Sequence, residues 1–471
     1  MNTPARSRAN AVRLVAAVVV ITLLVPSVVS ALTYDPSDAT ALERGTVTDP
    51  ANDSTVVSVQ GYTFQGNTNP KKPARVVSVD ERGGLEWTHD DNVGGSAWFF
   101  DVDQLPNGNL LVSSPRAGDT LLFEFDPDTQ ERVWAERFDM TDTHDVAYLG
   151  DDRIAIANMR AWNASAGVSD DRVVIYNRST DQITWEWYFK DHYPASTDGG
   201  YSEDWTHVND VDPIGDDRLL LSPRNFDQAI VVDIESKEIV ERLGSDGEYD
   251  VLREQHNPDW IESDDGTPTI LVADSENNRV VEYAKTEGEW VRTWEVGSES
   301  LNWPRDADRL PNGNTLITDT LNHRVMEVTP TGEVVWEYYA TWGPYDAERL
   351  GTPPESSGPT IRDMNASGSY AITGSANLTA GGEGSVGVDG RIRATFADTA
   401  LEAPMNEFAT RWAHITPWLR PVWMTGWDLA WTIGAVAVGI AWSGGEVVLR
   451  RRRLLAGGRR LLAAIRKRFG G

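Results

Sequence analysis

Apolar and polar positions alternate in short runs through the middle of the chain. Between residues 55 and 398, brief Val, Ile, Leu and Tyr segments are separated by clusters of Gly, Asp, Asn and Pro, and no long segment has the period of an amphipathic helix. Short β-prone runs bounded by turn residues are typical of antiparallel strands. The pattern therefore predicts an all-β domain.

One unit recurs along this region. It consists of an Asp-rich strand, a turn such as Pro-Asn-Gly-Asn, an apolar strand, a strand similar to Arg-Val-Val and a strand that ends in Trp. The first strands are marked in order by Phe100, His144, Asn209, His256, Arg305 and Arg362, at spacings of 44, 65, 47, 49 and 57 residues. These spacings are close to the length of a four-stranded propeller blade with loop insertions. We therefore expect a six-bladed β-propeller.

The two ends of this region are expected to close the ring. Residues 55–90 contain apolar strands but no copy of the Asp-rich first strand. Propellers commonly complete one blade with strands from both ends of the chain, which removes exposed sheet edges. We expect the strand at Arg362 to join the N-terminal strands. Seven blades are the alternative if residues 385–396 form further outer strands, and an immunoglobulin-type sandwich is disfavoured by six similar units at blade spacing.

Two apolar segments flank the predicted propeller. Residues 1–31 contain three arginines before an apolar run, which is typical of a signal peptide or an N-terminal membrane anchor. Residues 422–449 are apolar and about long enough to span a bilayer, and residues 450–471 form a basic tail. Because positive residues stay on the cytoplasmic side, we expect an extracytoplasmic propeller at residues 45–398, a linker at 399–421, a transmembrane helix and a cytoplasmic tail. Five external Asn-x-Ser/Thr sites are compatible with glycosylation, at Asn52, Asn163, Asn177, Asn365 and Asn377.

The charge balance is strongly acidic. The chain has 72 acidic and 42 basic residues and a net charge of −30, and only six of the basic residues are lysines. Such a surface suits a protein that is dissolved in concentrated salt, where self-repulsion is screened. A haloarchaeal source is the leading interpretation, and an acidic secreted protein of another origin is the alternative. The composition disfavours a nucleic-acid partner.

The composition also limits the chemistry. The chain has no cysteine, which excludes disulfides, thiolate nucleophiles and cysteine zinc sites. Two acidic turns, at residues 126–128 and 263–266, lack the full ligand spacing of a calcium loop. No metal site and no cofactor are predicted.

Histidines and arginines recur near the start of the first strand, which lines the channel of a propeller. His144, His256, Arg305 and Arg362 each precede the repeated Asp or Asn, and His207 lies two residues before Asn209. Neutral histidine can act as a nucleophile or a general base, and arginine binds sulfate or phosphate oxygens through forked hydrogen bonds. We expect these residues to converge at one mouth of the channel and to bind an anion. The alternative is that the histidines make buried hydrogen bonds that fix the inner strands.

Two pairs of segments carry a family resemblance. The first pair is Trp-Thr-His-Val-Asn-Asp-Val at 205–211 with Leu-Leu-Leu-Ser-Pro-Arg-Asn at 219–225, and the second is Gln-His-Asn-Pro at 255–258 with the segment 270–279. These resemble the His-x-Asn, Ser-x-Arg and Gln-His blades of arylsulfate sulfotransferases. The resemblance implies a six-bladed extracytoplasmic propeller that moves a sulfuryl group between phenols through a sulfohistidine, without a nucleotide donor. It also implies that His207 and His256 polarise the sulfate oxygens and that Arg279 or Arg224 neutralises their charge.

One position departs from the family pattern. The family's nucleophilic histidine lies in a later blade than the Gln-His motif, where this chain has Arg305, and His323 is the only later histidine of the predicted propeller. The expected function is sulfuryl transfer from a small aromatic sulfate donor to a phenolic acceptor, catalysed by His256, His207 and Arg279, with His144, Arg224, Arg305, Arg362 and Asn209 binding the anion. A non-catalytic surface propeller that binds ligands or acts as an interaction scaffold is the alternative. A hydrolase or lyase of the NHL type is a third interpretation.

Overall fold

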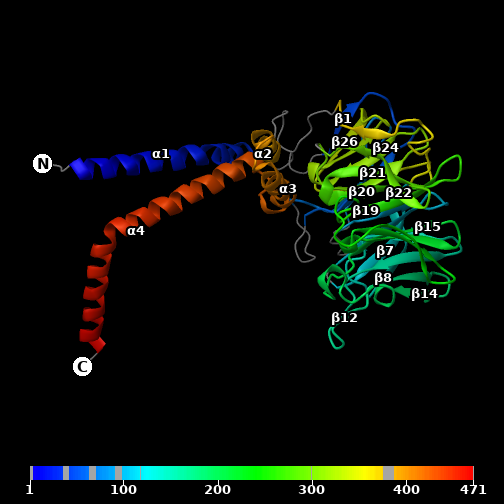
Figure 1. The fold of residues 1–471 in the computed structure, drawn as a ribbon, viewed down its shortest axis with the longest axis horizontal. Helices are drawn as coiled ribbons and strands as arrows, with labels where there is room; N and C mark the ends of the chain where they lie inside the picture. Colours follow the sequence, from blue (N-terminus) through cyan, green and yellow to red (C-terminus); the bar gives the residue numbers. More distant parts are fainter. Residues whose placement is uncertain are drawn as a thin grey trace. The chain divides into compact units, whose positions relative to one another are not determined.

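The chain forms two compact units in a computed structural model. The structure describes residues 4–35, 42–62, 71–90, 98–116, 118–298, 300–374 and 387–469, with side chains from residue 10 to residue 448. One unit spans residues 36–384, and the other combines residues 1–35 with 385–471. The first unit is a six-bladed β-propeller (Figure 1), which confirms the predicted fold class. The predicted glycosylation site at Asn377 lies outside the described residues.

Each blade is a sheet of four main strands, named in order from the channel outward. Blade 1 contains β27 (Pro344–Arg349), β2 (Thr55–Val59), β3 (Arg75–Val79) and β4 (Leu85–His89). Blade 2 contains β5 (Val102–Gln104), β6 (Leu110–Pro115), β7 (Thr120–Asp126) and β8 (Glu131–Phe138). Blade 3 contains β9 (Val146–Tyr148), β10 (Arg153–Asn158), β13 (Arg172–Asn177) and β14 (Gln182–Tyr188), and carries the hairpin of β11 (Trp162–Asn163) and β12 (Val168–Ser169).

The remaining three blades follow the same order. Blade 4 contains β15 (Val208–Ile214), β16 (Arg218–Pro223), β17 (Gln228–Asp233) and β18 (Ile239–Gly244). Blade 5 contains β19 (His256–Glu262), β20 (Pro268–Asp274), β21 (Arg279–Thr286) and β22 (Glu289–Val296), with β28 (Gly368–Tyr370) at its outer edge. Blade 6 contains β23 (Pro304–Arg309), β24 (Thr315–Asp319), β25 (Arg324–Val328) and β26 (Val334–Ala340), with β1 (Leu42–Val47) at its outer edge.

The closing strand is the element for which the sequence prediction was wrong. β27 closes the ring by pairing with β2, so that Arg349 lies opposite Thr55, whereas Arg362 lies in a turn. The overlooked copy is Pro-Tyr-Asp-Ala-Glu-Arg-Leu at 344–350, which repeats Pro-Arg-Asp-Ala-Asp-Arg-Leu at 304–310. Arg362 and the following Asp363 imitate the Arg-Asp pair of the unit, but they lie in a turn and not in a strand. Residues 388–396 form helix α2 (Val388–Phe396) instead of the outer strands that a seventh blade would need.

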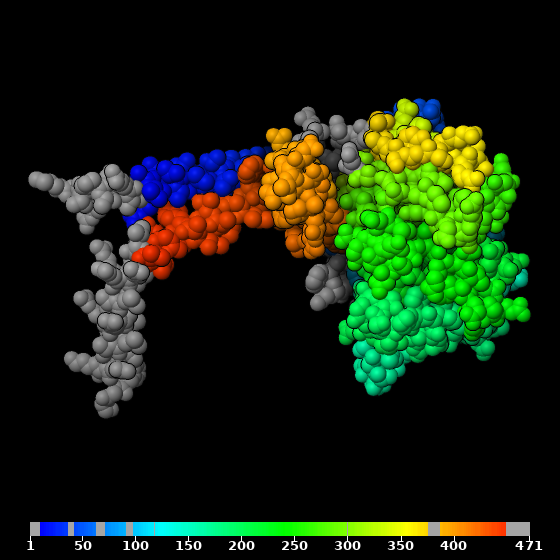
Figure 2. All heavy atoms as spheres, in the orientation of Figure 1, coloured from blue at the N-terminus to red at the C-terminus, as the bar shows by residue number. Residues whose placement is uncertain are grey.

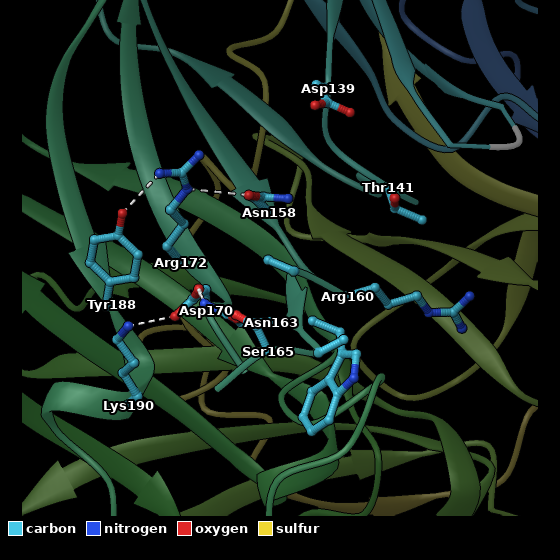
Figure 3. A pocket seen from close by; sticks show the side chains of 13 residues that line it. Asp139, Thr141, Asn158, Arg160, Asn163, Ser165, Asp170, Arg172, Tyr188 and Lys190 are labelled. Carbon is cyan, nitrogen blue, oxygen red and sulfur yellow. Dashed lines mark hydrogen bonds and ion pairs between the residues drawn. The ribbon is translucent and has the colours of Figure 1, made fainter. Parts of the chain in front are cut away.

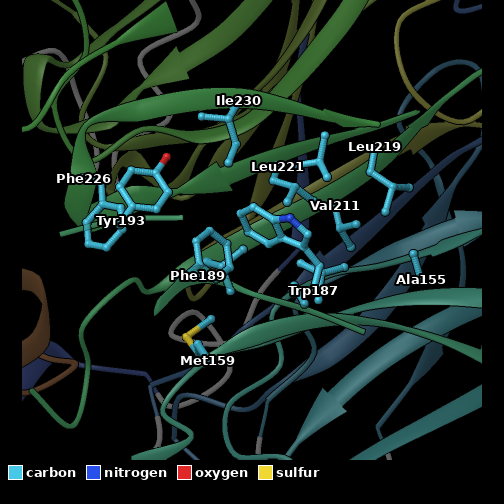
Figure 4. Packing of buried hydrophobic residues seen from close by; sticks show 14 of the residues in the cluster. Ala155, Met159, Trp187, Phe189, Tyr193, Val211, Leu219, Leu221, Phe226 and Ile230 are labelled. Carbon is cyan, nitrogen blue, oxygen red and sulfur yellow. The ribbon is translucent and has the colours of Figure 1, made fainter. Parts of the chain in front are cut away.

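Six hydrophobic clusters lie between neighbouring blades and form a closed ring. The cluster between blades 3 and 4 packs Trp187, Phe189, Trp205 and Phe226 against aliphatic residues of both sheets (Figure 4). Branched and aromatic side chains suit the pleated faces of packed sheets, and their removal from water is the main favourable contribution to folding. Each blade is therefore held from both sides, which fixes the inner strands around the channel.

The repeated Asp of the sequence unit links successive inner strands. In each link, one carboxylate oxygen of the Asp accepts a hydrogen bond from a backbone N–H of the next blade. The donor is the residue that follows the equivalent Asp of that blade. The distances are 3.2 Å from Ala347 to Asp306, 2.9 Å from Val102 to Asp346, 3.2 Å from Val146 to Asp101 and 3.0 Å from Val211 to Asp145. These buried bonds connect blades 6, 1, 2, 3 and 4 in order around the ring.

The second unit is helical. It contains α1 (Pro4–Thr33), α2, α3 (Glu402–Leu419) and α4 (Gly426–Phe469), and α1 lies against α4 (Figure 2). Two segments, Asn10–Thr33 and Gly426–Val448, are long and apolar enough to cross a membrane. Helix α3 occupies most of the segment where a linker was expected.

Candidate active site

Three histidines from neighbouring blades meet around Tyr345. His144 lies two residues before β9, His207 lies one residue before β15, His256 begins β19, and Tyr345 lies in β27. The ring centroid of His144 lies 5.0 Å from that of His207 and 5.4 Å from that of Tyr345, and His256 lies 6.0 Å from Tyr345. All four side chains are buried. The structure thus brings together three histidines that the sequence had singled out.

His207 forms a dyad with Asp204. Its Nδ1 lies 2.8 Å from Asp204 Oδ1, and because a carboxylate can only accept, Nδ1 carries the proton and Nε2 holds the lone pair. Nε2 is buried and has no hydrogen-bond partner among the described residues. Burial, followed by the positive charge of Arg224, lowers the pKa of His207 to about 3. The imidazole is therefore neutral at pH 7.

Arg160 holds the carboxylate of this dyad. Its Nε and Nη2 each lie 3.1 Å from an oxygen of Asp204, and its Nη1 lies 2.8 Å from Asp142. Burial alone would raise the pKa of Asp204, but the hydrogen bond from His207 and the charge of Arg160 lower it below its usual value. Asp204 therefore stays ionised and keeps the proton of His207 on Nδ1.

His256 is oriented by Ser275. The Ser275 hydroxyl donates to the Pro304 carbonyl at 2.6 Å, so its oxygen accepts the Nδ1 proton of His256 at 2.8 Å. This arrangement leaves the lone pair on Nε2, which is buried and has no hydrogen-bond partner in the described part of the chain. Burial, followed by the charges of Arg305 and Arg224, lowers the pKa of His256 well below its usual value. His256 is a second neutral imidazole with a free nitrogen.

His144 differs because both of its nitrogens are engaged. Its Nε2 lies 3.5 Å from Asp142 Oδ1, and its Nδ1 lies 3.0 Å from the hydroxyl of Tyr345. The nearby carboxylate favours a proton on Nε2, so that Nδ1 accepts the tyrosine proton. Burial lowers the pKa of His144, although Asp142 opposes this effect. His144 therefore holds Tyr345 rather than offering a free nitrogen.

Two arginines supply positive charge beside these histidines. Arg305 is buried, and the centre of its guanidinium lies 4.6 Å from the ring centroid of Tyr345 and 4.9 Å from that of Trp303. Its Nη1 donates to Gln60 at 2.5 Å, and burial lowers its pKa to about 10, so it stays protonated at neutral pH. Arg224, in the turn η4 (Arg224–Phe226), lies close enough for its charge to lower the pKa values of both histidines with free nitrogens.

Three residues expected at the site are placed in other roles. Arg279 bonds Asp274 at 2.6 Å, Glu295 at 3.0 Å and two backbone carbonyls, so its guanidinium is engaged within blade 5. Arg362 lies 3.9 Å from Asp265 in a turn. Asn209 donates through Nδ2 to the Gln255 carbonyl at 2.9 Å and braces the segment that carries His256.

Four residues of the site were missed by sequence reasoning. Tyr345 could have been found, because its segment repeats the one around Arg305. Arg160, Asp204 and Ser275 lie outside the repeated first strand, in loops whose path only the folded chain defines. No pattern in one sequence indicates these partners.

A pocket of about 580 Å³ lies on blade 3 (Figure 3). It is lined by polar side chains, among them Arg172, Tyr188 and Lys190, and Arg172 donates to Tyr188 at 2.9 Å. Arg160 also lines it, and Arg160 is the residue that clamps Asp142 and Asp204. The pocket and the histidine cluster thus share one side chain but are different places.

The arrangement suits the binding and attack of an oxyanion. Two neutral imidazoles present free Nε2 atoms in a buried site beside a protonated guanidinium. Arginine stabilises negative oxygens, and a neutral imidazole nitrogen can form a covalent bond to an electrophilic centre. Removal from water strengthens these electrostatic interactions.

Residues 47–252 match the family model described as Arylsulfotransferase (ASST). The matched segment contains His144 and His207 and ends shortly before His256. The match supports this family and an arylsulfotransferase-like function in general. No curated protein matches the chain.

The solved structures that match this chain are distant from it in sequence. A protein of unknown function from Bacteroides caccae has 12% identity and a TM-score of 0.44, over 64% of this chain and 99% of its own. Hydrazine synthase from Kuenenia stuttgartiensis has 14% identity and a TM-score of 0.35, over 54% and 70%. A catalytically inactive virginiamycin B lyase from Staphylococcus aureus has 10% identity and a TM-score of 0.38, over 64% and 88%. At these scores the matches carry no information about activity.

Proposed function

We propose that the protein is a membrane-anchored, extracytoplasmic arylsulfotransferase-like enzyme. It moves a sulfuryl group from a small aromatic sulfate to a phenol without a nucleotide donor and without a cofactor. The observation that carries this proposal is the pair of neutral imidazoles, His207 and His256, whose Nε2 atoms have no hydrogen-bond partner among the described residues and which lie near the positive charges of Arg224 and Arg305.

In the first step, His256 acts as the nucleophile. Its Nε2 lone pair forms a bond to sulfur while the bond between sulfur and the aryl oxygen breaks, and the phenolate leaves and takes a proton from water. Arg305 and Arg224 stabilise the negative sulfuryl oxygens as charge develops. Ser275 fixes the tautomer by accepting the Nδ1 proton. The product of this step is a sulfohistidine at His256, whereas in the family the nucleophilic histidine lies in a later blade, at the position that Arg305 occupies here.

In the second step, the acceptor phenol attacks the sulfur. The bond between sulfur and His256 Nε2 breaks, and the free Nε2 of His207 accepts the phenol proton and later releases it to water. Asp204 stabilises the imidazolium that forms briefly. Atoms and charge balance, because one aryl sulfate and one phenol give one phenol and one aryl sulfate.

Arg279 takes a positioning role in this scheme instead of a catalytic one. It bonds Asp274, which immediately precedes Ser275, the residue that orients His256. Arg362 has no part in the scheme, because it lies beside Asp265 in a turn.

The test measures transfer and hydrolysis separately. The purified protein is given 4-nitrophenyl sulfate and phenol, and the release of 4-nitrophenolate and the formation of phenyl sulfate are both followed. His256→Ala should abolish both signals, because the variant lacks the nucleophile of the first step. His192→Gln is the matched control, since His192 stacks on Trp187 in the segment after β14.

The scaffold interpretation makes a different prediction in the same experiment. If wild type shows no turnover but 4-nitrophenyl sulfate raises its melting temperature, and His256→Ala removes this rise, the site binds anions without catalysis. If neither turnover nor stabilisation occurs, the histidines only fix the inner strands and the proposed site is wrong.

For the membrane anchoring, we infer that α1 is retained and pairs with α4. Ser30 donates to Asp428 at 2.8 Å, and Ser27 donates to the Asp428 carbonyl at 3.1 Å and lies 2.7 Å from Thr432. Near the other end of the apolar segments, Arg13 pairs with Glu446, with Nη2 and Oε2 3.0 Å apart. Polar groups between apolar helices are costly in lipid unless they are paired. Cleavage after Ala31 would remove these partners from α4.

Peptide mass spectrometry of the protein isolated from cells tests retention. Peptides upstream of Ala31 support it, and a mature N-terminus at Leu32 contradicts it. For the orientation, protease added to intact cells should degrade the propeller and spare a tag placed after Gly471. An accessible tag would overturn the proposed topology.

The acidic composition supports salt adaptation as a further part of the proposal. At low salt, the excess carboxylates repel each other with little screening. The melting temperature should therefore rise with KCl concentration. A melting temperature that does not depend on salt would contradict salt adaptation.

A further inference from the structure

Carboxylates recur in pairs along the inner strands. Four strands carry an Asp-x-Asp or Asp-x-Glu sequence, formed by Asp101 and Asp103, Asp210 and Asp212, Asp306 and Asp308, and Asp346 and Glu348. All eight side chains are buried. In three of these pairs the first member accepts the backbone N–H of the next blade, so its charge is partly satisfied by the link between blades.

Glu355, which follows β27, belongs to two groups of neighbouring carboxylates. Oxygens of Asp212, Asp259 and Glu355 lie within 4.8 Å of one another, and so do oxygens of Asp103, Glu348 and Glu355. The strands β15, β19, β5 and β27 thus bring carboxylates to Glu355 from four blades.

Nearby arginines do not neutralise this group fully. Arg309, at the end of β23, pairs with Glu282 at 3.0 Å, and Arg349, at the end of β27, pairs with Glu327 at 3.0 Å. Each guanidinium is therefore engaged with a glutamate outside the group. Burying several carboxylates without a matching positive charge is very costly, so the group must take up protons or a cation.

Two oxygens in the first group point to a cation. Asp212 Oδ2 and Asp259 Oδ1 accept no hydrogen bond from the described residues, although the side chains are only 6% and 2% exposed. The other oxygen of Asp259 is held by the Ser356 hydroxyl, which itself accepts the Arg309 N–H at 2.6 Å. This outer hydrogen-bond chain orients Asp259 in the way that surrounding residues orient metal ligands.

The chemistry of the group favours calcium among the common divalent cations. Calcium binds six to eight oxygens at about 2.3–2.6 Å in flexible geometry, so two of its ligands can lie up to about 5 Å apart. Magnesium needs near-ideal octahedral geometry at about 2.0–2.1 Å, which limits that separation to about 4.2 Å. Oxygens within 4.8 Å of one another are compatible with calcium, and its flexible geometry suits ligands that come from different blades better than the strict octahedron of magnesium does.

We propose that Asp212, Asp259 and Glu355 bind a calcium ion in the propeller channel, with Asp103 and Glu348 in the second group that contains Glu355. The ion replaces the protons that these buried acids would otherwise need. It ties the inner strands of blades 4 and 5 to the segment after the closing strand. This site is separate from the histidine cluster and does not depend on the proposed sulfuryl transfer.

The test compares the full chain in detergent with and without calcium at a constant, high KCl concentration. After treatment with EDTA and dialysis, calcium should raise the melting temperature of wild type by a few degrees and saturate at about one ion per chain by metal analysis. Binding to the folded state stabilises it as the ligand exceeds its dissociation constant. Magnesium at the same concentration should have a smaller effect.

The variant Glu355→Gln should reverse the order of the melting temperatures when calcium is added. This reversal separates calcium binding at the site from charge screening on the acidic surface. Without calcium it should melt at or above wild type, because one repelling carboxylate is gone, and with calcium it should melt below wild type. Glu235→Gln, at an exposed position of blade 4, is the matched control and should respond to calcium like wild type. Asp212→Asn repeats the test if Glu355→Gln does not fold.

Two results would overturn the proposal. One is the absence of retained calcium together with the absence of a stability change in wild type, which would mean that protons neutralise the group. The other is an equal calcium response in wild type, Glu355→Gln and Asp212→Asn, which would mean that calcium acts on the acidic surface.

Discussion

The histidine cluster and the carboxylate group around Glu355 bury titratable residues in two different ways along the same inner strands. In the cluster, a partner fixes Nδ1 of both His207 and His256, and burial makes these imidazoles neutral. In the carboxylate group, Asp212 and Asp259 keep oxygens without hydrogen-bond partners among the described residues. A histidine loses its charge by losing a proton and becomes a nucleophile. A carboxylate loses its charge only by gaining a proton or a cation.

One repeated strand can thus serve two purposes at different positions. The first positions of the inner strands, and the loops before them, hold groups that suit reaction with an anion. Positions further along hold groups that suit a cation. Single substitutions in the histidine cluster and among the carboxylates further along the inner strands, together with a pH profile, can test whether the two sets of residues act independently.

The largest expected effect is on catalysis at Arg305. Arg305→Ala should lower kcat/KM for 4-nitrophenyl sulfate by about 10²–10³-fold, because a buried donor to the developing negative charge is lost. Arg305→Lys should recover part of this loss. Asp308→Asn, on the same strand, should leave kcat/KM unchanged. If Asp308→Asn lowered kcat/KM as much as Arg305→Ala at an unchanged melting temperature, the histidine cluster and the carboxylates further along the strands would be coupled.

The next effect concerns the partner of His207. Asp204→Asn removes the carboxylate that keeps the His207 proton on Nδ1 and that Arg160 clamps. We expect kcat to fall on the order of a hundredfold, the usual contribution of a positioned general base. KM should change little, because Arg305 and Arg224 still bind the donor. An unchanged kcat, measured at saturating phenol, would exclude His207 as the base.

A smaller effect is expected on stability at the links between blades. Asp346→Ala leaves the buried Val102 N–H without its acceptor and should lower the free energy of unfolding by about 1–3 kcal/mol. Asp216→Ala, at an exposed position, should have no measurable effect. Urea unfolding curves for both variants, measured with calcium present, decide this. Equal curves would show that the link contributes nothing.

The smallest effect is expected for pH. The pKa of His207 is lowered to about 3 and that of His256 lies well below its usual value, so both imidazoles stay neutral as pH falls from 7.5 to 5.5. The value of kcat/KM, which reports the free enzyme, should therefore change by less than about threefold over this range. A decline with a midpoint near the usual histidine pKa would show that the histidines are exposed to water in the working protein.

Much of the fold could be predicted from the sequence, because hydrophobic period and blade spacing are local signals. Six units, the inner strands at His144, Asn209, His256 and Arg305, and the terminal apolar segments follow directly from them. The closing strand was misplaced because Arg362 and Asp363 imitate the repeated pair, while the true copy at residues 344–350 has Tyr in place of Arg. The error came from giving the Arg-Asp pair more weight than the match over the whole segment 344–350.

The candidate site could be predicted only for residues that lie in the repeat. His144, His207, His256 and Arg305 lie at or just before the first strands of their blades, so the symmetry of the ring brings them together. Arg279 was expected there by resemblance, but its guanidinium bonds Asp274 and Glu295. The group around Glu355 was not predicted, because its members come from four inner strands and a loop, and no local spacing connects them.

The closing strand has a consequence for the biosynthesis of this protein. β27 follows every other main strand of the propeller in the sequence, yet it completes the blade to which β2, the first of those strands, belongs. While the chain is being made, the edge of β2 that faces β27 stays unpaired until almost the whole domain has emerged. An unpaired strand edge is a template for association with other chains. A message truncated just before Pro344 should therefore yield a product that aggregates or is degraded, although it encodes all three histidines.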